Sequence, residues 1–91
     1  MHSIHLEIRG RVQGVGFRWY VREKAREFRL TGWVKNKSDG NVEIAAFGEP
    51  APLQAFKSAV TKGPAGAKVA TVIELPPIPP DSVTTSFDIT R

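Results

Sequence analysis

The sequence predicts an α+β fold of the ferredoxin-like βαββαβ type (a split βαβ), with two helices on one face of an antiparallel sheet and a short terminal fifth strand. Two segments repeat apolar residues at helical spacing, and the segments around them have the character of strands. Strand and helix segments follow each other in the order this fold requires. At 91 residues the chain has room for one modest core, so residues 1–91 are expected to form a single domain.

The first half of the chain predicts a strand, a helix and a hairpin. Residues 4–9 alternate, with one apolar face made of Ile4, Leu6 and Ile8. Apolar residues then recur at spacings of four, four and three, which predicts a helix with the stripe Phe17, Val21, Ala25 and Phe28. Residues 31–36 and 42–47 predict two strands, joined by a turn with Asp39-Gly40 at its tip.

The second half predicts a helix and two strands. Pro50 and Pro52 suit the first turn of a helix, which Lys62-Gly63-Pro64 ends; its apolar face is Leu53, Phe56 and Val60. Residues 69–75 predict a fourth strand whose apolar face is Val69, Ile73 and Leu75. The proline-rich segment 76–80 is an extended connector to a last short strand that contains Phe87 and Ile89.

The turn after the first helix is short. The apolar stripe ends at Phe28, and the chain must reverse by Thr31 to enter the next strand. Such a turn commonly uses a left-handed residue just past the helix, usually glycine. The sequence has Arg29 there, so we expect a left-handed arginine.

The predicted topology brings two distant segments together. In a βαββαβ sheet the third strand lies between the first and the second and runs against both. The first two strands are therefore parallel, and their carboxyl ends share one edge of the sheet. The loop at 11–18 follows the first strand and Asn36 ends the second, so we expect both at this edge.

The loop from Gly10 to Arg18 has the features of an anion site. It lies between a strand and the start of a helix, where free N–H groups and the helix dipole favour negative charge. Gly14 and Gly16 let the backbone approach a ligand, and Arg18 adds a planar charged fork suited to phosphate. Trp19 stands where a dinucleotide motif has glycine or alanine, and no Gly-Lys-Ser/Thr occurs. A glycine-rich turn with a surface arginine explains the same spacing about equally well.

Composition excludes several other classes of site. The chain has no cysteine, and neither His2 nor His5 has partners at metal-ligand spacing, so we expect no metal and no cofactor. The net charge of +4 favours anionic ligands in general. No apolar run, cleavage signal or membrane span is evident, so the expectation is a soluble, cytoplasmic protein without a membrane partner. Nothing in the sequence demands an oligomer, so we expect a monomer.

Two long motifs in register resemble the paired signature of the acylphosphatase family. They are residues 10–18 and residues 31–36; Gly40-x-Val42-Glu43 and Gly63-Pro64 fit as well. The resemblance covers residues 4 to about 75, and beyond them only the terminal strand. It implies a hydrolase that converts a small acyl phosphate to a carboxylate and inorganic phosphate without a metal. Inorganic phosphate would also act as an inhibitor.

The resemblance also implies roles for individual residues. Arg18 would be the phosphate-binding arginine and Asn36 would hold the attacking water. The phosphoryl oxygens would lie in a ring of backbone N–H groups, from Val12, Gln13, Gly14, Val15, Gly16 and Phe17. Trp19 and Tyr20 could line a substrate mouth, but one of the two is expected in the core, so neither is assigned.

Two other functions fit the same element order. A non-catalytic module that binds RNA or a carbamoyl-phosphate-type ligand would share the fold. RNA-recognition domains stack bases on aromatic residues, whereas the polar face of the first strand here is His5, Glu7 and Arg9. The third strand offers Phe47 alone, so we expect no nucleic-acid partner. The second alternative is a domain of a larger carbamoyl-phosphate-handling maturation protein; a free-standing enzyme is preferred.

Overall fold

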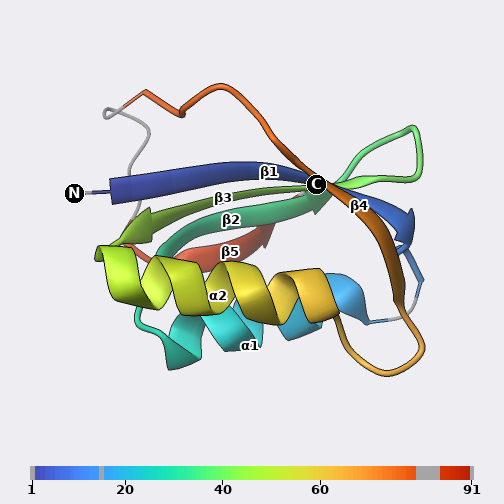
Figure 1. The fold of residues 1–91 in the computed structure, drawn as a ribbon, viewed down its shortest axis with the longest axis horizontal. Coiled ribbons are helices and arrows are strands. Elements are labelled where there is room, and N and C mark those ends of the chain that lie inside the picture. The colour runs from blue at the N-terminus through green and yellow to red at the C-terminus, as the bar shows by residue number, and fades with distance from the viewer. Residues whose placement is uncertain (1, 15, 80–84, 91) are drawn as a thin grey trace.

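The computed structural model describes residues 2–14, 16–79 and 85–90, and within them the elements follow the predicted order. The five strands and two helices are β1 (His2–Arg11), α1 (Phe17–Glu27), β2 (Thr31–Asn36), β3 (Val42–Gly48), α2 (Pro50–Lys62), β4 (Lys68–Glu74) and β5 (Phe87–Thr90). Both helices cover the same face of the sheet and leave the other face open (Figure 1). No helix in these residues is long and apolar enough to cross a membrane.

The sheet has the order β4-β1-β3-β2-β5. Strand β3 lies between β1 and β2 and runs antiparallel to both, as the topology predicts. The carboxyl ends of β1 and β2 therefore lie at one edge, where α1 also begins (Figure 1). This edge carries the loop at 12–16 and Asn36, so the expected juxtaposition is confirmed.

The predicted terminal strand is present as β5, and its direction, which the sequence left open, is parallel to its neighbour β2. Phe87 to Thr90 pair with Gly32 to Lys35 of β2 in parallel register, so the sheet is mixed. The reason lies in the connector. Strand β4 is antiparallel to β1, so it ends at the end of the sheet where β1 and β2 begin. The connector then leads from β4, the strand at one edge, to β5, the strand at the opposite edge. Because β5 starts at the same end of the sheet as β2, the two strands are parallel.

The prediction that Val69, Ile73 and Leu75 share the apolar face of β4 is wrong. Val72 lies opposite Ile8 on the core face, whereas Ile73 lies opposite Glu7 on the open face. A bulge shifts the register between Arg9 and Gly10, and Val69 then returns to the core face opposite Gly10. A bulge adds one residue to one strand and so reverses the alternation beyond it.

The core lies between the sheet and the two helices. The predicted stripe of α1 is buried at Phe17, Val21 and Ala25, and that of α2 at Leu53, Phe56 and Val60. Phe87 of β5 meets Phe56 edge-on, with ring centroids 5.9 Å apart. Phe17, the first residue of α1, is fully buried, and this fixes the orientation of the helix start. The neighbouring Arg18 therefore points away from the core.

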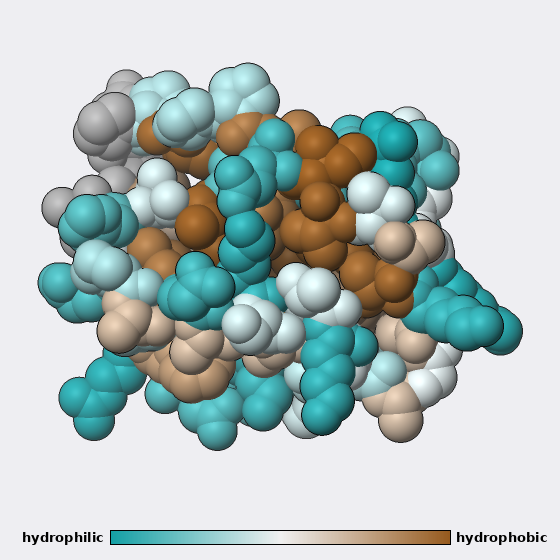
Figure 2. Space-filling view, viewed as in Figure 1, coloured by the Kyte–Doolittle hydropathy of each residue, from teal (hydrophilic) through white to brown (hydrophobic). Residues whose placement is uncertain are grey.

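Strand β4 covers the core less completely than its neighbours. Val69 and Val72 are only partly buried against the core, and apolar surface is visible between α2 and the strands in Figure 2. An ion pair between Lys57 and Glu74 joins α2 to β4 across this region. It is an exposed pair, and such pairs contribute little to stability.

The turn after α1 contains the predicted left-handed arginine. Arg29 has a φ of 57°, and among the described residues no other non-glycine has a positive φ. The Leu30 N–H donates to the Ala25 carbonyl at 2.8 Å, and the Arg29 N–H donates to the Arg26 carbonyl at 3.1 Å. These two bonds form a Schellman motif, the helix end that normally selects glycine at this position.

Candidate active site

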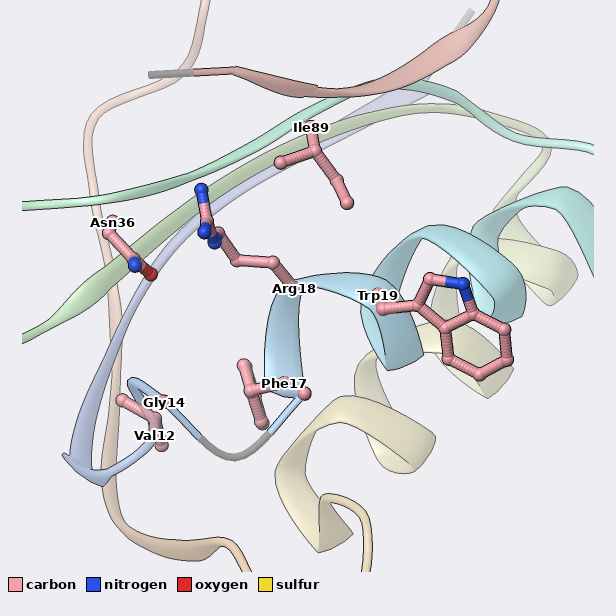
Figure 3. A pocket seen from close by; sticks show the side chains of 8 residues that line it. Val12, Gly14, Phe17, Arg18, Trp19, Asn36 and Ile89 are labelled. Carbon is pink, nitrogen blue, oxygen red and sulfur yellow. The ribbon is translucent and has the colours of Figure 1, made fainter.

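A pocket of about 190 Å³ opens at the edge where β1 and β2 end. The residues that line it come from the loop, the start of α1, the end of β2 and strand β5: Val12, Gly14, Gly16, Phe17, Arg18, Trp19, Asn36 and Ile89. Figure 3 shows Arg18 at its centre, with Asn36 on one side and Trp19 on the other. The pocket thus contains both residues that the resemblance singles out.

The amino end of α1 faces this pocket without a cap. The Ncap residue is Gly16, no side chain caps the helix, and its first turn holds no acidic residue. The first bond that the helix makes is from the Tyr20 N–H to the Gly16 carbonyl, at 3.0 Å. The N–H groups of the first turn therefore lack intrahelical acceptors and carry the positive end of the dipole.

The two loop glycines adopt left-handed backbone conformations. Gly14 has a φ of 74° and Gly16 a φ of 73°, which L-residues with a Cβ rarely adopt. A Cβ built on either glycine would meet no protein atom within 4 Å. Within the protein, these positions therefore need glycine for its backbone conformation rather than for space.

Arg18 is a half-buried cation without a partner in the described part of the chain. Among the described residues its guanidinium makes no hydrogen bond and no ion pair. Of the described residues that line the pocket, none carries a carboxylate. A guanidinium left open in a concave site is suited to bind an anion with two oxygens at once.

Asn36 also presents an unused group. Its Oδ1 is buried and has no hydrogen-bond partner within residues 2–14, 16–79 and 85–90, although most buried polar atoms have one. The side chain turns toward Arg18 in Figure 3. The Asn36 Oδ1 can therefore accept a hydrogen bond from a water molecule that lies beside an anion bound to Arg18.

Gln13 has a role that its position in the sequence did not reveal. Its side-chain Nε2 donates to the Lys37 carbonyl at 2.9 Å and to the Asn41 carbonyl at 3.0 Å. The Lys37 N–H itself donates to the Asn41 carbonyl at 2.8 Å. Gln13 therefore ties the loop to the turn that directly follows Asn36. A polar residue with two donors in a tight loop was the only signal for this role.

The other predicted site residues are distributed as follows. Val12 and Phe17 are buried beside the pocket, while Val15 lies outside the described residues. The sequence left Trp19 and Tyr20 unassigned, and the structure separates them. The Tyr20 hydroxyl donates to the Ala59 carbonyl at 3.1 Å, whereas Trp19 is exposed at the pocket. Ile89 was expected only as a strand residue.

The histidines and carboxylates of the described residues make no metal site. No three His, Asp or Glu side chains of this part of the chain gather closely enough to hold an ion. His5 is engaged elsewhere, since its Nε2 lies 2.6 Å from Glu43 Oε2 and its Nδ1 lies 2.8 Å from the Pro76 carbonyl. Both ring nitrogens of His5 are therefore engaged within the protein.

Known proteins share both the sequence and the fold. The family model described as Acylphosphatase matches residues 4–89. An acylphosphatase of Geobacillus thermodenitrificans is 44% identical over 82 residues, which are 89% of this chain and 87% of that protein. The crystal structure of acylphosphatase from Bacillus subtilis superimposes with a TM-score of 0.86 at 40% identity over the full length of both chains. An acylphosphatase structure from Coxiella burnetii gives 0.83 at 39% identity, over 97% of this chain and 90% of that one. The chain therefore belongs to the acylphosphatase family.

Proposed function

We propose that this chain hydrolyses acyl phosphates in the pocket around Arg18 and Asn36. One observation carries the proposal: an unpaired guanidinium and an unpaired buried amide oxygen line one pocket at the uncapped start of α1. Membership of the acylphosphatase family supplies the class of reaction, a hydrolase that acts on an acid anhydride of phosphate. The products are a carboxylate and inorganic phosphate.

The phosphoryl group binds to the loop. Arg18 holds two of its oxygens, and backbone N–H groups of the loop between β1 and α1 surround the rest of the phosphoryl group. In phosphoryl transfer the charge is spread over three equatorial oxygens, so positioning and electrostatic stabilisation supply most of the catalysis. Donors that are already in place act as an oxyanion hole does. Inorganic phosphate makes the same contacts, so it competes with the substrate.

Asn36 orients the attacking water. One O–H of the water donates a hydrogen bond to Asn36 Oδ1, and this turns a lone pair of the water oxygen toward phosphorus. An amide cannot take up the proton near neutral pH. The reaction requires no general base on the protein. The water oxygen bonds to phosphorus, the bond from phosphorus to the acyl oxygen breaks, and both water protons remain on the phosphate that forms. The leaving carboxylate departs as an anion.

Isotope labelling tests this proposal. Benzoyl phosphate is hydrolysed in ¹⁸O-enriched water with EDTA present, and both products are analysed by mass spectrometry. We expect rapid turnover and the label in phosphate, because water attacks phosphorus. Label in benzoate would place the attack at the carbonyl carbon and contradict the role of Asn36. Activity lost to EDTA and restored by magnesium would contradict a site made of N–H groups and one arginine.

An RNA-binding function is not favoured by the open face of the sheet. Glu7 and Glu43 lie opposite each other on this face. Glu7 pairs with Lys37 and Arg9, and Glu43 pairs with His5 and Lys35. Carboxylates in the middle of the sheet repel a phosphate backbone. A monomeric, cytoplasmic enzyme with a small-molecule substrate is the form that we propose.

A further inference from the structure

We propose that Trp19 and Ile89 form the subsite for the acyl half of the substrate, and that it takes an uncharged, apolar acyl group, with an aromatic one preferred. The inference rests on the proposed function, since it concerns the group attached to the phosphate. It adds a substrate class that the phosphate contacts alone do not define.

Trp19 is unusual among the described residues. Its side chain is 58% exposed, and no other large hydrophobic side chain of this part of the chain is left exposed. It has no ring contact there, whereas Trp33 meets His5 at 6.0 Å and lies 5.1 Å below the Lys35 ammonium. A single exposed apolar residue needs no explanation by itself. This one lines the pocket directly beside Arg18.

Ile89 supplies a second apolar wall from the far end of the sequence. It lies opposite Val34 in the parallel pair of β5 and β2, and it is partly buried against the core. Figure 3 shows its side chain pointing from β5 toward Arg18. The parallel direction of β5 is what brings this residue to the edge of the sheet where Asn36 lies.

The direction of the reaction places the acyl group at this wall. In phosphoryl transfer the attacking and leaving oxygens lie roughly in line through phosphorus. With the water at Asn36, the acyl oxygen leaves on the far side of the phosphoryl group. In Figure 3, Trp19 lies on the side of Arg18 opposite to Asn36. The leaving group therefore departs toward the Trp19 side of the pocket.

The charge of the pocket defines the class of acyl group. Among the described residues that line it, Arg18 is the one charged side chain, and the phosphoryl group occupies it. A free carboxylate on the acyl group would lose its hydration beside Trp19 and Ile89 and would find no second cation there to pair with. Burial of an unpaired charge is costly, so a charged acyl group is disfavoured. An aromatic acyl group gains contact with the indole face or edge.

Two substrates that share the phosphate and differ in the acyl group test the subsite. We measure kcat/KM for benzoyl phosphate and acetyl phosphate, and the inhibition constant of inorganic phosphate, for the wild type and Trp19→Ala. We expect Trp19→Ala to lower kcat/KM for benzoyl phosphate by about tenfold and that for acetyl phosphate by less than about twofold. The inhibition constant should not change. Trp19→Phe should restore most of the loss, and Trp33→Ala should leave the ratio of the two substrates as in the wild type.

The outcomes separate the two proposals. An equal loss on both substrates in Trp19→Ala, or no loss on either, would overturn the subsite and leave the hydrolase intact. A wild type that hydrolyses neither substrate would overturn both. A gain of function adds a second test: Trp19→Lys should raise the relative kcat/KM for succinyl phosphate, whose free carboxylate then meets a cation. No change in that preference would count against the charge argument.

Discussion

The pocket and the open face of the sheet both contain polar and charged side chains, but within the part of the chain that the structure describes, those in the pocket lack protein partners and those on the open face are ion-paired. In the pocket, Arg18 and the Asn36 amide oxygen have no partner among the described residues. On the open face, Glu7 is 5% exposed and pairs with both Lys37 and Arg9. The difference shows what separates the two roles here: the paired charges of the open face join segments of the fold, whereas the unpaired polar groups line a pocket and can bind a ligand.

The two regions also meet at one point in the chain. Lys37, which binds Glu7 on the open face, directly follows Asn36, and its carbonyl accepts the hydrogen bond from Gln13 of the loop. Lys37 thus contacts both regions, through its ammonium and through its backbone carbonyl. Because the Gln13 bond goes to the backbone of Lys37 and not to its side chain, we expect substitutions in the pocket to affect activity and substitutions of the open-face carboxylates to affect stability.

The largest effect is expected for Arg18. Arg18→Ala removes the charge-assisted contact with the phosphoryl group, worth about 1.5–3 kcal/mol in binding, and a further factor of roughly 10² in kcat. Both the affinity for inorganic phosphate and kcat should fall. Arg18→Lys should be nearly as poor, because an ammonium cannot span two oxygens. Arg29→Gly, which removes an arginine at the other end of α1, is the matched control. Near-normal kcat/KM in the lysine variant would rule out a two-oxygen contact.

Asn36→Ala should lower kcat alone. Loss of the water's acceptor costs on the order of a hundredfold, since a displacement of about 1 Å is enough for that. Inorganic phosphate should bind nearly as well as to the wild type, because the amide does not contact it. Inhibition constants for phosphate in the two variants make the comparison. The same loss of phosphate affinity in Asn36→Ala and Arg18→Ala would show that the two residues do not have separate roles.

A smaller change in kcat is expected for Gln13→Ala, which cuts the tie between the loop and the turn after Asn36. We expect kcat to fall by about three- to tenfold, within the range that misplacement of a catalytic group produces. Gln13→Glu should be worse, because a carboxylate would face two carbonyl oxygens. Gln54→Ala, on the exposed side of α2, is the control. If Gln13→Ala loses stability in urea without any loss of kcat, the tie serves the fold alone.

The open face should respond to pH instead. Hydrogen bonds from Lys37 and then Arg9 hold the pKa of the Glu7 carboxyl below its ordinary value of 4.5. The bond to Glu7 holds the pKa of the Lys37 ammonium above its ordinary value of 10.5. A lowered carboxyl pKa stabilises the fold above pH 4.5, and that stability is lost as the pH falls through the folded-state value. A raised ammonium pKa stabilises it below pH 10.5, and that stability is lost as the pH rises through the folded-state value.

Glu7→Gln tests this window. Glutamine does not titrate, so the variant should unfold at lower urea concentration than the wild type near neutral pH. The gap between the two urea midpoints should narrow as the pH falls below 4.5 through the folded-state pKa of Glu7. Activity measured on the folded variant should stay close to that of the wild type. A gap that is constant across this pH range would mean that the pair contributes through packing and not through charge.

The smallest effect is expected for Arg29→Gly. A residue with a Cβ loses roughly 1–2 kcal/mol in the left-handed conformation of Arg29. Glycine relieves this strain but gives the unfolded chain more freedom, worth about 0.4–1 kcal/mol. The net gain should be up to about 1 kcal/mol in urea unfolding, with unchanged activity. A destabilised variant would mean that contacts of the arginine side chain outweigh the backbone strain.

The sequence predicted the parts of the fold that depend on local pattern. Alternation and helical spacing gave the elements, and the known sheet order placed Arg18 and Asn36 together. It failed where local pattern carries no information. The bulge opposite Arg9 and Gly10 depends on the pairing of β1 with β4, which the sequence of β4 alone does not show, so the prediction of its apolar face was wrong. Four residues do not encode a strand's direction, so the direction of β5 stayed open and the place of Ile89 in the pocket was missed. The hydrogen bonds from Gln13 to the Lys37 and Asn41 carbonyls also could not be predicted, because the spacing of residues does not show which backbone groups a side chain reaches across a loop.

The parallel strand β5 has a consequence for how the specificity of such a protein can change. It joins the sheet through β2 alone, at the edge, and it contributes Ile89 to the pocket but nothing to the loop at 12–18. Exchange of residues 87–90 between relatives, together with position 19, should therefore transfer a preference for one acyl group without rebuilding the grip on phosphate. On these proposals, the phosphate contacts depend on the first loop, whereas the preference for an acyl group would depend on position 19 and on a short strand at the far end of the sequence.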